Sequence, residues 1–182
     1  MVEDKDFFIF ENILSEKDQE IVKDTLFGYD FPWTFIPDVT FKNPNTEPRP
    51  AFSHVFYEQN GAIKSNFCNI VHKITEEGLI KLKKNKASII QARSFLQMPL
   101  NKSFDTYDAP HLDLDYNHIV FLYYVCDSDG DTILFNENNI SNIKHKITPK
   151  KGRLLIFEGK TWHTAEQPKE NIRCIINIDL IV

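Results

Sequence analysis

The chain has 182 residues, of which 42% are hydrophobic and 26% are charged, and it carries a net charge of −5. This length suits one domain with its own core, and the acidic balance does not favour broad electrostatic binding to nucleic acid, although it leaves room for a local basic patch. No stretch has the roughly 18 apolar residues of a membrane span, and the acidic start MVEDKDFFIF does not resemble a signal peptide, so we expect a soluble, cytoplasmic protein without membrane contact.

Aromatic and sulfur-containing residues give two further indications. Aromatic residues make up 13% of the chain, with fifteen Phe, which is typical of a compact barrel or sandwich interior. The three cysteines, Cys68, Cys126 and Cys174, are an odd number without a CxxC spacing. They therefore indicate reduced core residues of an intracellular protein, not a disulfide framework or a zinc site.

The N-terminal part predicts a strand followed by a helix. Residues 7–10 form a short apolar run, and Ser15 has the character of a helix N-cap, with Asp18 in the first turn. The helix is expected to end at Gly28. Its predicted buried face consists of Ile21, Val22 and Leu26.

Two further segments precede the middle of the chain. Residues 31–50 are rich in proline and aromatic residues, which favours a strand and an ordered loop. Residues 62–82 predict a second amphipathic helix. Its apolar residues at helical spacing are Ile63, Phe67, Ile70, Val71, Ile74 and Leu79. We interpret residues 1–86 as a support of strands and helices.

From residue 87 the sequence changes to short strands separated by turn residues. Such a series predicts a sandwich or barrel, with the preceding helices covering one face of the larger sheet. We find no internal repeat or linker, so residues 1–182 are expected to be a single domain with a β core over 87–182. The six candidate strands lie within 87–99, 118–125, 131–136, 143–149, 152–157 and 173–182.

The segment APHLDLDYNHIVFLYYV, residues 109–125, places ionisable groups directly before an apolar strand. Their burial requires solvent, an ion-pair partner or a metal ion. On an extended backbone His111 and Asp113 project to the same side, and His163 follows a later predicted strand. Two imidazoles and one carboxylate are the facial triad of non-haem iron(II) oxygenases, which leaves three metal positions open for other ligands.

Arg173 opens the last predicted strand, ten residues after His163. With a period of two, Arg173 shares a face with Ile175 and Asn177, whereas Cys174, Ile176 and Ile178 lie on the other face. A guanidinium at the mouth of a barrel can hold a carboxylate through two charge-assisted hydrogen bonds. Beside a metal with open positions, the implied ligand is a small dicarboxylate.

The motifs HLD, DGDTILF, KKGRLLIFEGKTWH and the arginine of the final strand resemble the 2-oxoglutarate- and iron(II)-dependent oxygenase superfamily. The resemblance is to its prolyl-hydroxylase-like branch, including small bacteriophage members. It covers residues 91–182 in order, whereas residues 1–90 match only loosely. It implies a double-stranded β-helix, that is, a jelly-roll or cupin-like barrel of mainly β structure with supporting N-terminal α-helices.

The resemblance also implies individual roles. His111, Asp113 and His163 would ligate Fe(II) as the catalytic residues, and Arg173 would bind the distal carboxylate of 2-oxoglutarate. Tyr124 would donate its hydroxyl to that carboxylate. Gln97 stands where relatives often carry an amide, so it is expected near the chelating end of the cosubstrate.

Two positions near these residues qualify the resemblance. The Gly-Gly pair of the family reads here as Asp129-Gly130, which keeps one glycine at the turn. Trp162, directly before the distal histidine, is large enough to shape the substrate entrance. O₂ is the other cosubstrate that the resemblance implies, with ascorbate as an optional addition.

Structural interpretations compete for several of these residues. Tyr124 can also be core packing, and His118 is expected to be a hydrogen-bonded structural residue. Asp115 is expected in a solvated turn, although it could also bind substrate. His54, His72 and His145 have no partner spacing and are most simply surface or helix residues.

The expected function is hydroxylation of a C–H bond, with a protein prolyl residue as the first candidate substrate and succinate and CO₂ as co-products. The loops 36–50 and 100–109 are expected to form a lid over an extended peptide. A nucleic-acid demethylase or an oxygenase of a small metabolite is the alternative within the superfamily, and only the lysines of residues 81–86 offer a basic run for nucleic acid. From another class, the barrel could be a non-catalytic cupin-like metal-binding module.

Overall fold

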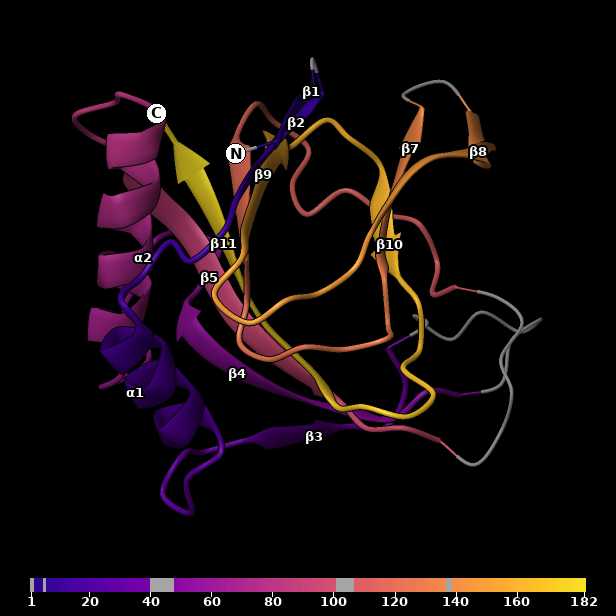
Figure 1. Ribbon diagram of the computed structural model, residues 1–182, viewed down its shortest axis with the longest axis horizontal. Coiled ribbons are helices and arrows are strands. Elements are labelled where there is room, and N and C mark those ends of the chain that lie inside the picture. The colour runs from indigo at the N-terminus through magenta and orange to yellow at the C-terminus, as the bar shows by residue number, and fades with distance from the viewer. Residues whose placement is uncertain (1, 5, 40–47, 101–106, 137–138) are drawn as a thin grey trace.

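The structure is a computed structural model that describes residues 2–4, 6–39, 48–100, 107–136 and 139–182 (Figure 1). It contains two helices and eleven strands within these residues. The helices are α1 (Glu16–Leu26) and α2 (Cys68–Lys81). The strands are β1 (Val2–Asp4), β2 (Phe7–Phe10), β3 (Thr34–Ile36), β4 (Ala51–Tyr57), β5 (Ser88–Gln97), β6 (Ile119–Tyr124), β7 (Thr132–Asn136), β8 (Asn139–Ile147), β9 (Leu154–Glu158), β10 (His163–Ala165) and β11 (Arg173–Ile181).

The strands form two antiparallel sheets. The larger sheet has eight strands in the order β1-β2-β9-β6-β11-β5-β4-β3, and the smaller has three in the order β10-β7-β8. In Figure 1 both helices lie on one side of the larger sheet, and the smaller sheet lies on its other side. This is the predicted mainly β jelly-roll arrangement with helices at the front, so the fold-class prediction is confirmed.

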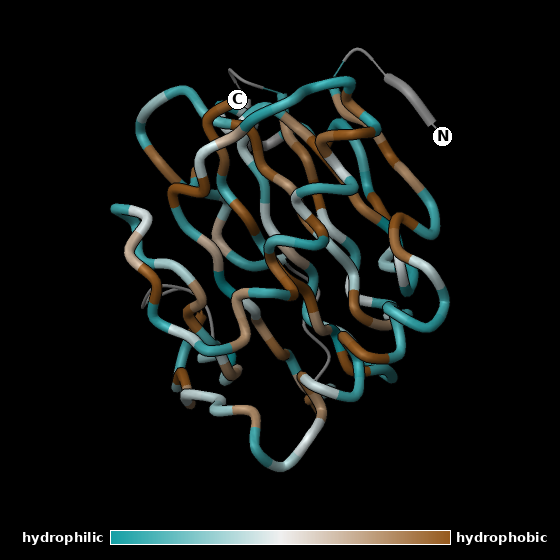
Figure 2. The backbone as a smooth tube through the Cα atoms, turned by 90° about the vertical axis from the view of Figure 1, so that its left-hand side faces the viewer, coloured by the Kyte–Doolittle hydropathy of each residue, from teal (hydrophilic) through white to brown (hydrophobic). Residues whose placement is uncertain are grey.

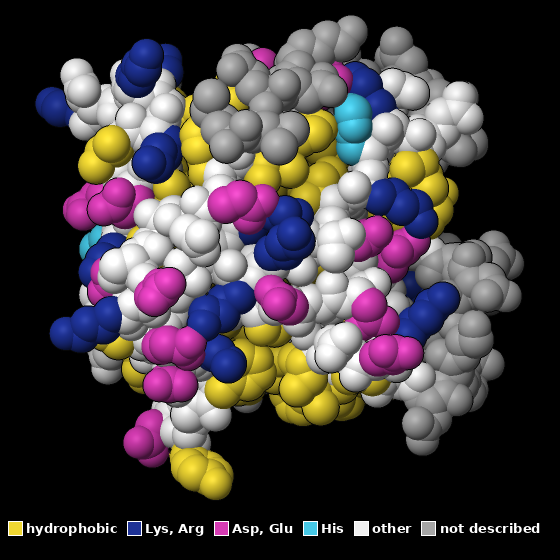
Figure 3. All heavy atoms as spheres, viewed as in Figure 1, with side chains coloured by type: hydrophobic (Ala, Val, Ile, Leu, Met, Phe, Trp, Pro, Cys, Tyr) yellow, Lys and Arg dark blue, Asp and Glu magenta, His cyan; other side chains and the backbone are white. Residues whose placement is uncertain are grey.

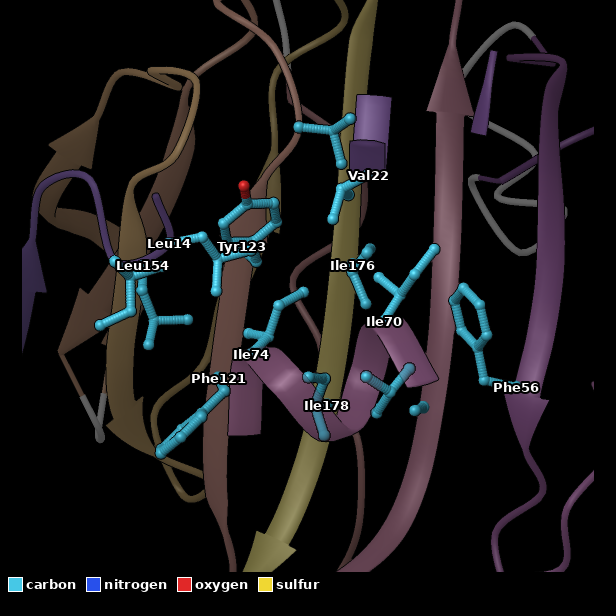
Figure 4. Close-up of a cluster of buried hydrophobic side chains, with 14 of the residues drawn as sticks. Leu14, Val22, Phe56, Ile70, Ile74, Phe121, Tyr123, Leu154, Ile176 and Ile178 are labelled. Atoms are coloured by element: carbon cyan, nitrogen blue, oxygen red, sulfur yellow. The ribbon is translucent and has the colours of Figure 1, made fainter. Parts of the chain in front are cut away.

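The helices bury one face of the larger sheet. Ser15 caps α1, because its Oγ accepts a hydrogen bond from the Asp18 backbone N–H at 3.2 Å. The apolar cluster in Figure 4 joins both helices to β4, β6, β9 and β11. Its labelled members are Leu14, Val22, Phe56, Ile70, Ile74, Phe121, Tyr123, Leu154, Ile176 and Ile178.

Two details of the helix predictions are wrong. Ile21 is 49% exposed and does not join Val22 and Leu26 in the core. The second helix begins at Cys68, and Ile63 is 66% exposed in the preceding segment, where it forms an isolated bridge with Tyr57. Backbone pairing to β4 therefore replaces helical hydrogen bonds at the start of the predicted helix.

A second apolar cluster fills the space between the two sheets. It joins side chains of β2, β6, β9 and β11 in the larger sheet to Leu134 of β7 and Ile147 of β8 in the smaller one. Ile175 belongs to this cluster, whereas Ile176 and Ile178 belong to the cluster under the helices. The alternation expected for the last strand is therefore correct, and the face that carries Arg173 lies between the sheets.

All six strands predicted after residue 87 are present, with small shifts at their ends. Figure 2 shows apolar colour along many strands and hydrophilic colour at many connecting turns. The strands β1, β4 and β10 were not predicted from the sequence. Within β4, His54 is buried among Phe31, Phe56 and Phe67, and hydrogen bonds join its ring to Pro32 O and Ser65 Oγ, so the surface interpretation of His54 is wrong.

The structure also shows the state of the cysteines and the length of the helices. All three cysteines are free, with Cys68 and Cys174 buried and Cys126 half-buried. Among the described residues, neither helix is long and apolar enough to cross a lipid bilayer.

Candidate metal centre and carboxylate site

Residues 111 and 163 lie side by side, although 52 positions separate them in sequence. The His111 N–H donates to the His163 carbonyl at 3.0 Å, and the His163 N–H donates to the His111 carbonyl at 3.1 Å. This antiparallel bridge joins the segment before β6 to β10. The two imidazole rings therefore lie close together, with centroids 4.7 Å apart and planes tilted by 52°.

The Asp113 carboxylate lies against both rings. Its Oδ1 is 3.8 Å from His111 Nε2 and its Oδ2 is 3.3 Å from His163 Nε2. One donor atom from each of the three side chains thus lies within 4.8 Å of the others. Asn177 of β11 donates its side-chain N–H to Asp113 Oδ2 at 3.1 Å and so orients the carboxylate.

The tautomers of both histidines suit metal binding. His111 Nδ1 lies 3.1 Å from the Ala109 carbonyl, and His163 Nδ1 lies 3.1 Å from the Thr161 carbonyl. A carbonyl oxygen only accepts, so each Nδ1 carries a proton, and each Nε2, which faces Asp113, is the ring nitrogen left for a metal. Two imidazoles and a carboxylate arranged in this way fit a divalent metal such as Fe(II).

The electrostatics of this group show how tightly the charges interact. Burial alone would raise the pKa of the Asp113 carboxyl, but His163 and His111 outweigh burial and hold this pKa well below its usual range. Burial alone would lower the pKa of His163, but the Asp113 carboxylate outweighs the effect of burial and raises this pKa. Asp113 is therefore an ionised carboxylate ready to accept a cation.

Arg173 lies inside the molecule with 5% of its surface exposed. Its Nε–H donates to the Gly130 carbonyl at 3.0 Å, and its two terminal nitrogens donate to Gln97 Oε1 at 3.1 Å and Thr132 Oγ1 at 3.0 Å. All three acceptors are neutral. Among the described residues, no carboxylate lies within ion-pair distance of this guanidinium.

Tyr124 and Gln97 both lie beside the guanidinium of Arg173. The Tyr124 hydroxyl donates to Thr132 Oγ1 at 2.8 Å, so Thr132 joins Tyr124 to Arg173. Burial raises the pKa of Tyr124 to about 12, which keeps the hydroxyl protonated as a donor at neutral pH. The structure places Gln97 against Arg173, and its role toward the chelating end of a cosubstrate stays a prediction.

A buried ion pair that the sequence did not indicate extends this network. Arg49 is fully buried, and its Nη1 lies 2.6 Å from Asp108 Oδ1. The other Asp108 oxygen accepts a hydrogen bond from Gln97 Nε2 at 3.2 Å. Burial raises the pKa of Asp108, although Arg49 and Arg173 oppose that shift. Neither residue belongs to a periodic pattern, so the sequence offered no signal for the pair.

The two groups share the inner face of β11. Arg173 and Asn177 are four residues apart on that face, so their Cα atoms are separated by roughly 13 Å at about 3.3 Å per residue. Asp179 follows on the same face and is fully buried. Burial and the charge of Asp113 raise the pKa of Asp179 to about 8. The alternation that identified Arg173 and Asn177 would also have identified Asp179.

The structure also shows where His118, Asp115, Trp162 and parts of the expected lid loops lie. His118 is buried, and its Nδ1 lies 2.7 Å from the Tyr116 carbonyl, which agrees with a hydrogen-bonded structural residue. Asp115 is exposed and Trp162 is half-buried. Of the two expected lid loops, residues 40–47 and 101–106 lie outside the described residues. A wide groove between α2 and the start of β5 contains none of the predicted site residues.

Comparison with known proteins places this geometry on a known fold. No family model matches the chain, and the search for similar curated sequences found no match. Among solved structures, a viral collagen prolyl hydroxylase from Paramecium bursaria Chlorella virus-1, solved as a 2OG complex, has 17% identity and a TM-score of 0.62 over 98% of this chain and 97% of its own.

Two further structures extend this similarity. A prolyl hydroxylase from Trichoplax adhaerens, in complex with a hypoxia inducible factor peptide fragment, has 15% identity and a TM-score of 0.64, with coverage of 96% and 83%. An oxidoreductase of the 2OG-Fe(II) oxygenase family from Burkholderia pseudomallei has 9% identity and a TM-score of 0.71, with coverage of 96% and 84%. At these identities the similarity establishes the fold, which is that of the 2OG-Fe(II) oxygenases.

Proposed function

We propose that the chain is an iron(II)- and 2-oxoglutarate-dependent oxygenase that hydroxylates a C–H bond, with a prolyl residue of a peptide as substrate. Two sites on one inner face support this proposal most directly. The first is a donor set of two imidazoles and one carboxylate. The second is a buried guanidinium without an ionic partner among the described residues. Burying a cation without an anionic partner destabilises the protein by several kcal/mol, because the charge loses its hydration. A dicarboxylate that also reaches the metal would supply that anion.

Each residue has a specific task in this proposal. His111, Asp113 and His163 would hold the iron, with Asn177 fixing the Asp113 carboxylate. Bound iron, with 2-oxoglutarate and O₂, would supply the oxidation that inserts one oxygen atom into the substrate C–H bond and leaves succinate and CO₂.

The carboxylate site would position the cosubstrate. Arg173 would exchange neutral acceptors for the distal carboxylate of 2-oxoglutarate, which forms shorter and stronger charge-assisted hydrogen bonds. Tyr124, neutral at physiological pH, would donate its hydroxyl to the same carboxylate. The apolar cluster around Tyr124 and Ile175 would exclude water from this end of the site.

A peptide substrate is supported by the neighbours and by the surface. Four of the similar structures are prolyl hydroxylases, and one of them was solved with a peptide fragment. The Tyr107 ring lies 5.3 Å from Phe135, and Phe135 N–H donates to the Trp162 carbonyl, so aromatic residues gather beside β10. On the face in Figure 3, acidic and basic side chains are interspersed, which differs from the basic surface that nucleic acid needs.

The test is a panel of prolyl peptides, oligonucleotides and amino acids incubated with the chain, Fe(II), 2-oxoglutarate and O₂. Mass spectrometry scores the gain of one oxygen atom, and succinate is measured in the same samples. We expect a hydroxylated prolyl peptide with stoichiometric succinate. His111→Ala should abolish both products, whereas Asp115→Asn, an exposed change four residues away, should preserve both.

The outcomes separate the parts of the proposal. Oxidised nucleic acid or amino acid with an unmodified peptide would replace the substrate and keep the chemistry. Absence of succinate and of any oxidised product, in a protein that binds Fe(II), would contradict the oxygenase and favour a metal-binding module. Equal activity in His111→Ala and the parent would contradict the ligand assignment.

A further inference from the structure

A second group of metal-binding side chains lies beside the first. His118, Asp179 and Asp113 each offer one donor atom, and these atoms lie within 4.8 Å of one another. His118 Nε2 is 3.7 Å from Asp179 Oδ1, and both side chains have 0% exposure. This group shares Asp113 with the candidate iron site but uses neither His111 nor His163.

The facing atoms of this group have no hydrogen-bond partner among the described residues. Within the part of the chain that the structure describes, neither His118 Nε2 nor Asp179 Oδ1 makes a hydrogen bond, and Asn177 Oδ1 is also unsatisfied. A gap of 3.7 Å is too long for a direct hydrogen bond between a ring nitrogen and a carboxylate oxygen. Leaving such groups buried and unpaired costs about 1–3 kcal/mol each, so the arrangement calls for a ligand between them.

The other atoms of both side chains are fixed so that the unpaired atoms face each other. His118 Nδ1 lies 2.7 Å from the Tyr116 carbonyl and therefore carries the proton, which leaves a lone pair on Nε2. Gln91 donates its side-chain N–H to Asp179 Oδ2 at 3.0 Å, so Oδ1 is the free oxygen. Metal-binding histidines and carboxylates are typically oriented by partners of this kind.

The backbone also makes room for the His118 ring. A Cβ atom at Gly159 would lie 2.1–2.3 Å from three ring atoms, which no side chain can tolerate. The Gly159 N–H donates to the His118 carbonyl at 2.9 Å and holds the two residues together. Glycine at this position therefore keeps the imidazole pointed at Asp179.

The geometry points to a second, buried divalent-cation site formed by His118, Asp179 and the shared carboxylate of Asp113. Metal–ligand bonds of about 2.0–2.2 Å that meet at an open angle span the distance between His118 Nε2 and Asp179 Oδ1. One imidazole and two carboxylates suit Mn²⁺, Fe²⁺ or Zn²⁺. With both sites filled, Asp113 bridges two cations.

The second cation binds more weakly than the first. Once the first site holds a dication, a second one at close range is repelled, and the two carboxylates of the cluster must serve both ions. The full chain therefore binds two divalent ions in two affinity classes. This inference does not depend on the proposed hydroxylation, because it concerns ion binding alone.

Equilibrium dialysis of the full chain against Mn²⁺ tests the site, with bound metal counted by elemental analysis. The parent should bind two Mn²⁺ per chain at saturation. Asp179→Asn and His118→Gln should each bind one, the tighter ion being retained. His111→Ala should also bind one, whereas the exposed control Asp115→Asn should still bind two.

Each alternative result is decisive. One Mn²⁺ in the parent, or two in both Asp179→Asn and His118→Gln, overturns the second site and leaves a proton or a water between the side chains. If His111→Ala still binds two ions, the first site and the proposed function fail instead. Should the variants not fold, electron paramagnetic resonance of the parent decides: a spin-coupled Mn²⁺ pair supports the site, and only isolated Mn²⁺ at saturation contradicts it.

Discussion

The surroundings of a single residue can indicate its chemical role, and Arg173 is the clearest example in this chain. Its guanidinium is buried and makes hydrogen bonds only to neutral acceptors. Its position at the head of an apolar strand was readable from sequence, because strand alternation placed it on an inner face. Order and alternation likewise indicated His111, Asp113 and His163, and the structure brings their donor atoms together.

Other residues of the site could not be predicted in this way. Arg49 and Asp108 are 59 positions apart and form their ion pair only because two connecting segments meet in the folded chain. No period relates such residues, so their partnership is a product of tertiary structure. His54 escaped notice for the same reason, since its strand was not recognised.

Arg173→Met should weaken 2-oxoglutarate binding strongly. Loss of one partner of a buried charge pair costs about 2–5 kcal/mol, which corresponds to an affinity loss of at least about 30-fold. Arg173→Lys keeps the charge but not the two-pronged geometry and should fall between Met and the parent. Isothermal titration of 2-oxoglutarate into Mn²⁺-loaded protein measures the effect.

A matched surface change sharpens that comparison. Lys151, half-buried and paired with Glu20, is a cation with no assigned role in binding metal or cosubstrate, so Lys151→Met should bind like the parent. Equal affinity of Arg173→Met and Lys151→Met for 2-oxoglutarate would remove Arg173 from the cosubstrate site.

At the level of elements, α2 shows how tertiary contacts limit prediction from periodicity. The apolar spacing of Ile70, Val71, Ile74 and Leu79 correctly predicted its buried face. The same pattern extended the helix too far toward the N-terminus, because Ile63 pairs with Tyr57 through the backbone instead. Alternation predicted β11 more reliably, because successive side chains of this strand point in turn to the helices and to the smaller sheet.

Ile74→Ala should destabilise the protein by about 2–5 kcal/mol, because Ile74 is fully buried under the sheet and truncation leaves a cavity. Ile80 lies on the same helix but is 65% exposed, so Ile80→Ala should change the free energy of unfolding by about 0.5 kcal/mol or less. Urea denaturation followed by circular dichroism compares the two. Equal destabilisation would show that α2 does not pack as described.

Gly78→Ala should also destabilise the fold, even though alanine favours helices. An added Cβ would lie 2.4 Å from the Phe121 ring and 3.0 Å from Leu154. The resulting overpacking costs about 1–3 kcal/mol, which outweighs the roughly 1 kcal/mol of helix propensity. Glu76→Ala, on the exposed side of α2, is the control, and an increase in melting temperature for Gly78→Ala would contradict the close helix–sheet contact.

At the level of the whole molecule, the site joins parts that fold from distant segments. His163 belongs to β10 of the smaller sheet, and Asn177 and Arg173 belong to β11 of the larger one. The resemblance over residues 91–182 anticipated this order of motifs. The N-terminal part was harder to predict, because β4 pairs with β5 and β3 pairs with β4, and no local pattern specifies these pairings.

Because the candidate ligands join β10 of the smaller sheet to the segment before β6 of the larger one, metal binding should stabilise the whole fold. At a metal concentration 100-fold above Kd, binding adds about 2.7 kcal/mol to the free energy of unfolding. For a chain of this size that corresponds to a rise in melting temperature of roughly 5–10 °C. Scanning calorimetry with Mn²⁺ and after chelation measures the rise. Asp113→Asn should lose it, and an undiminished rise in that variant would place the metal elsewhere.

The most direct test of the central claim is an anaerobic titration of the Fe(II)-loaded chain with 2-oxoglutarate, followed by visible absorption. Chelation of iron by a 2-keto acid should produce a metal-to-ligand charge-transfer band that saturates at one 2-oxoglutarate per chain. His111→Ala should not show the band, and Arg173→Met should require a much higher concentration. No band in the parent, or an identical titration in all three proteins, would contradict a cosubstrate held between this metal centre and Arg173.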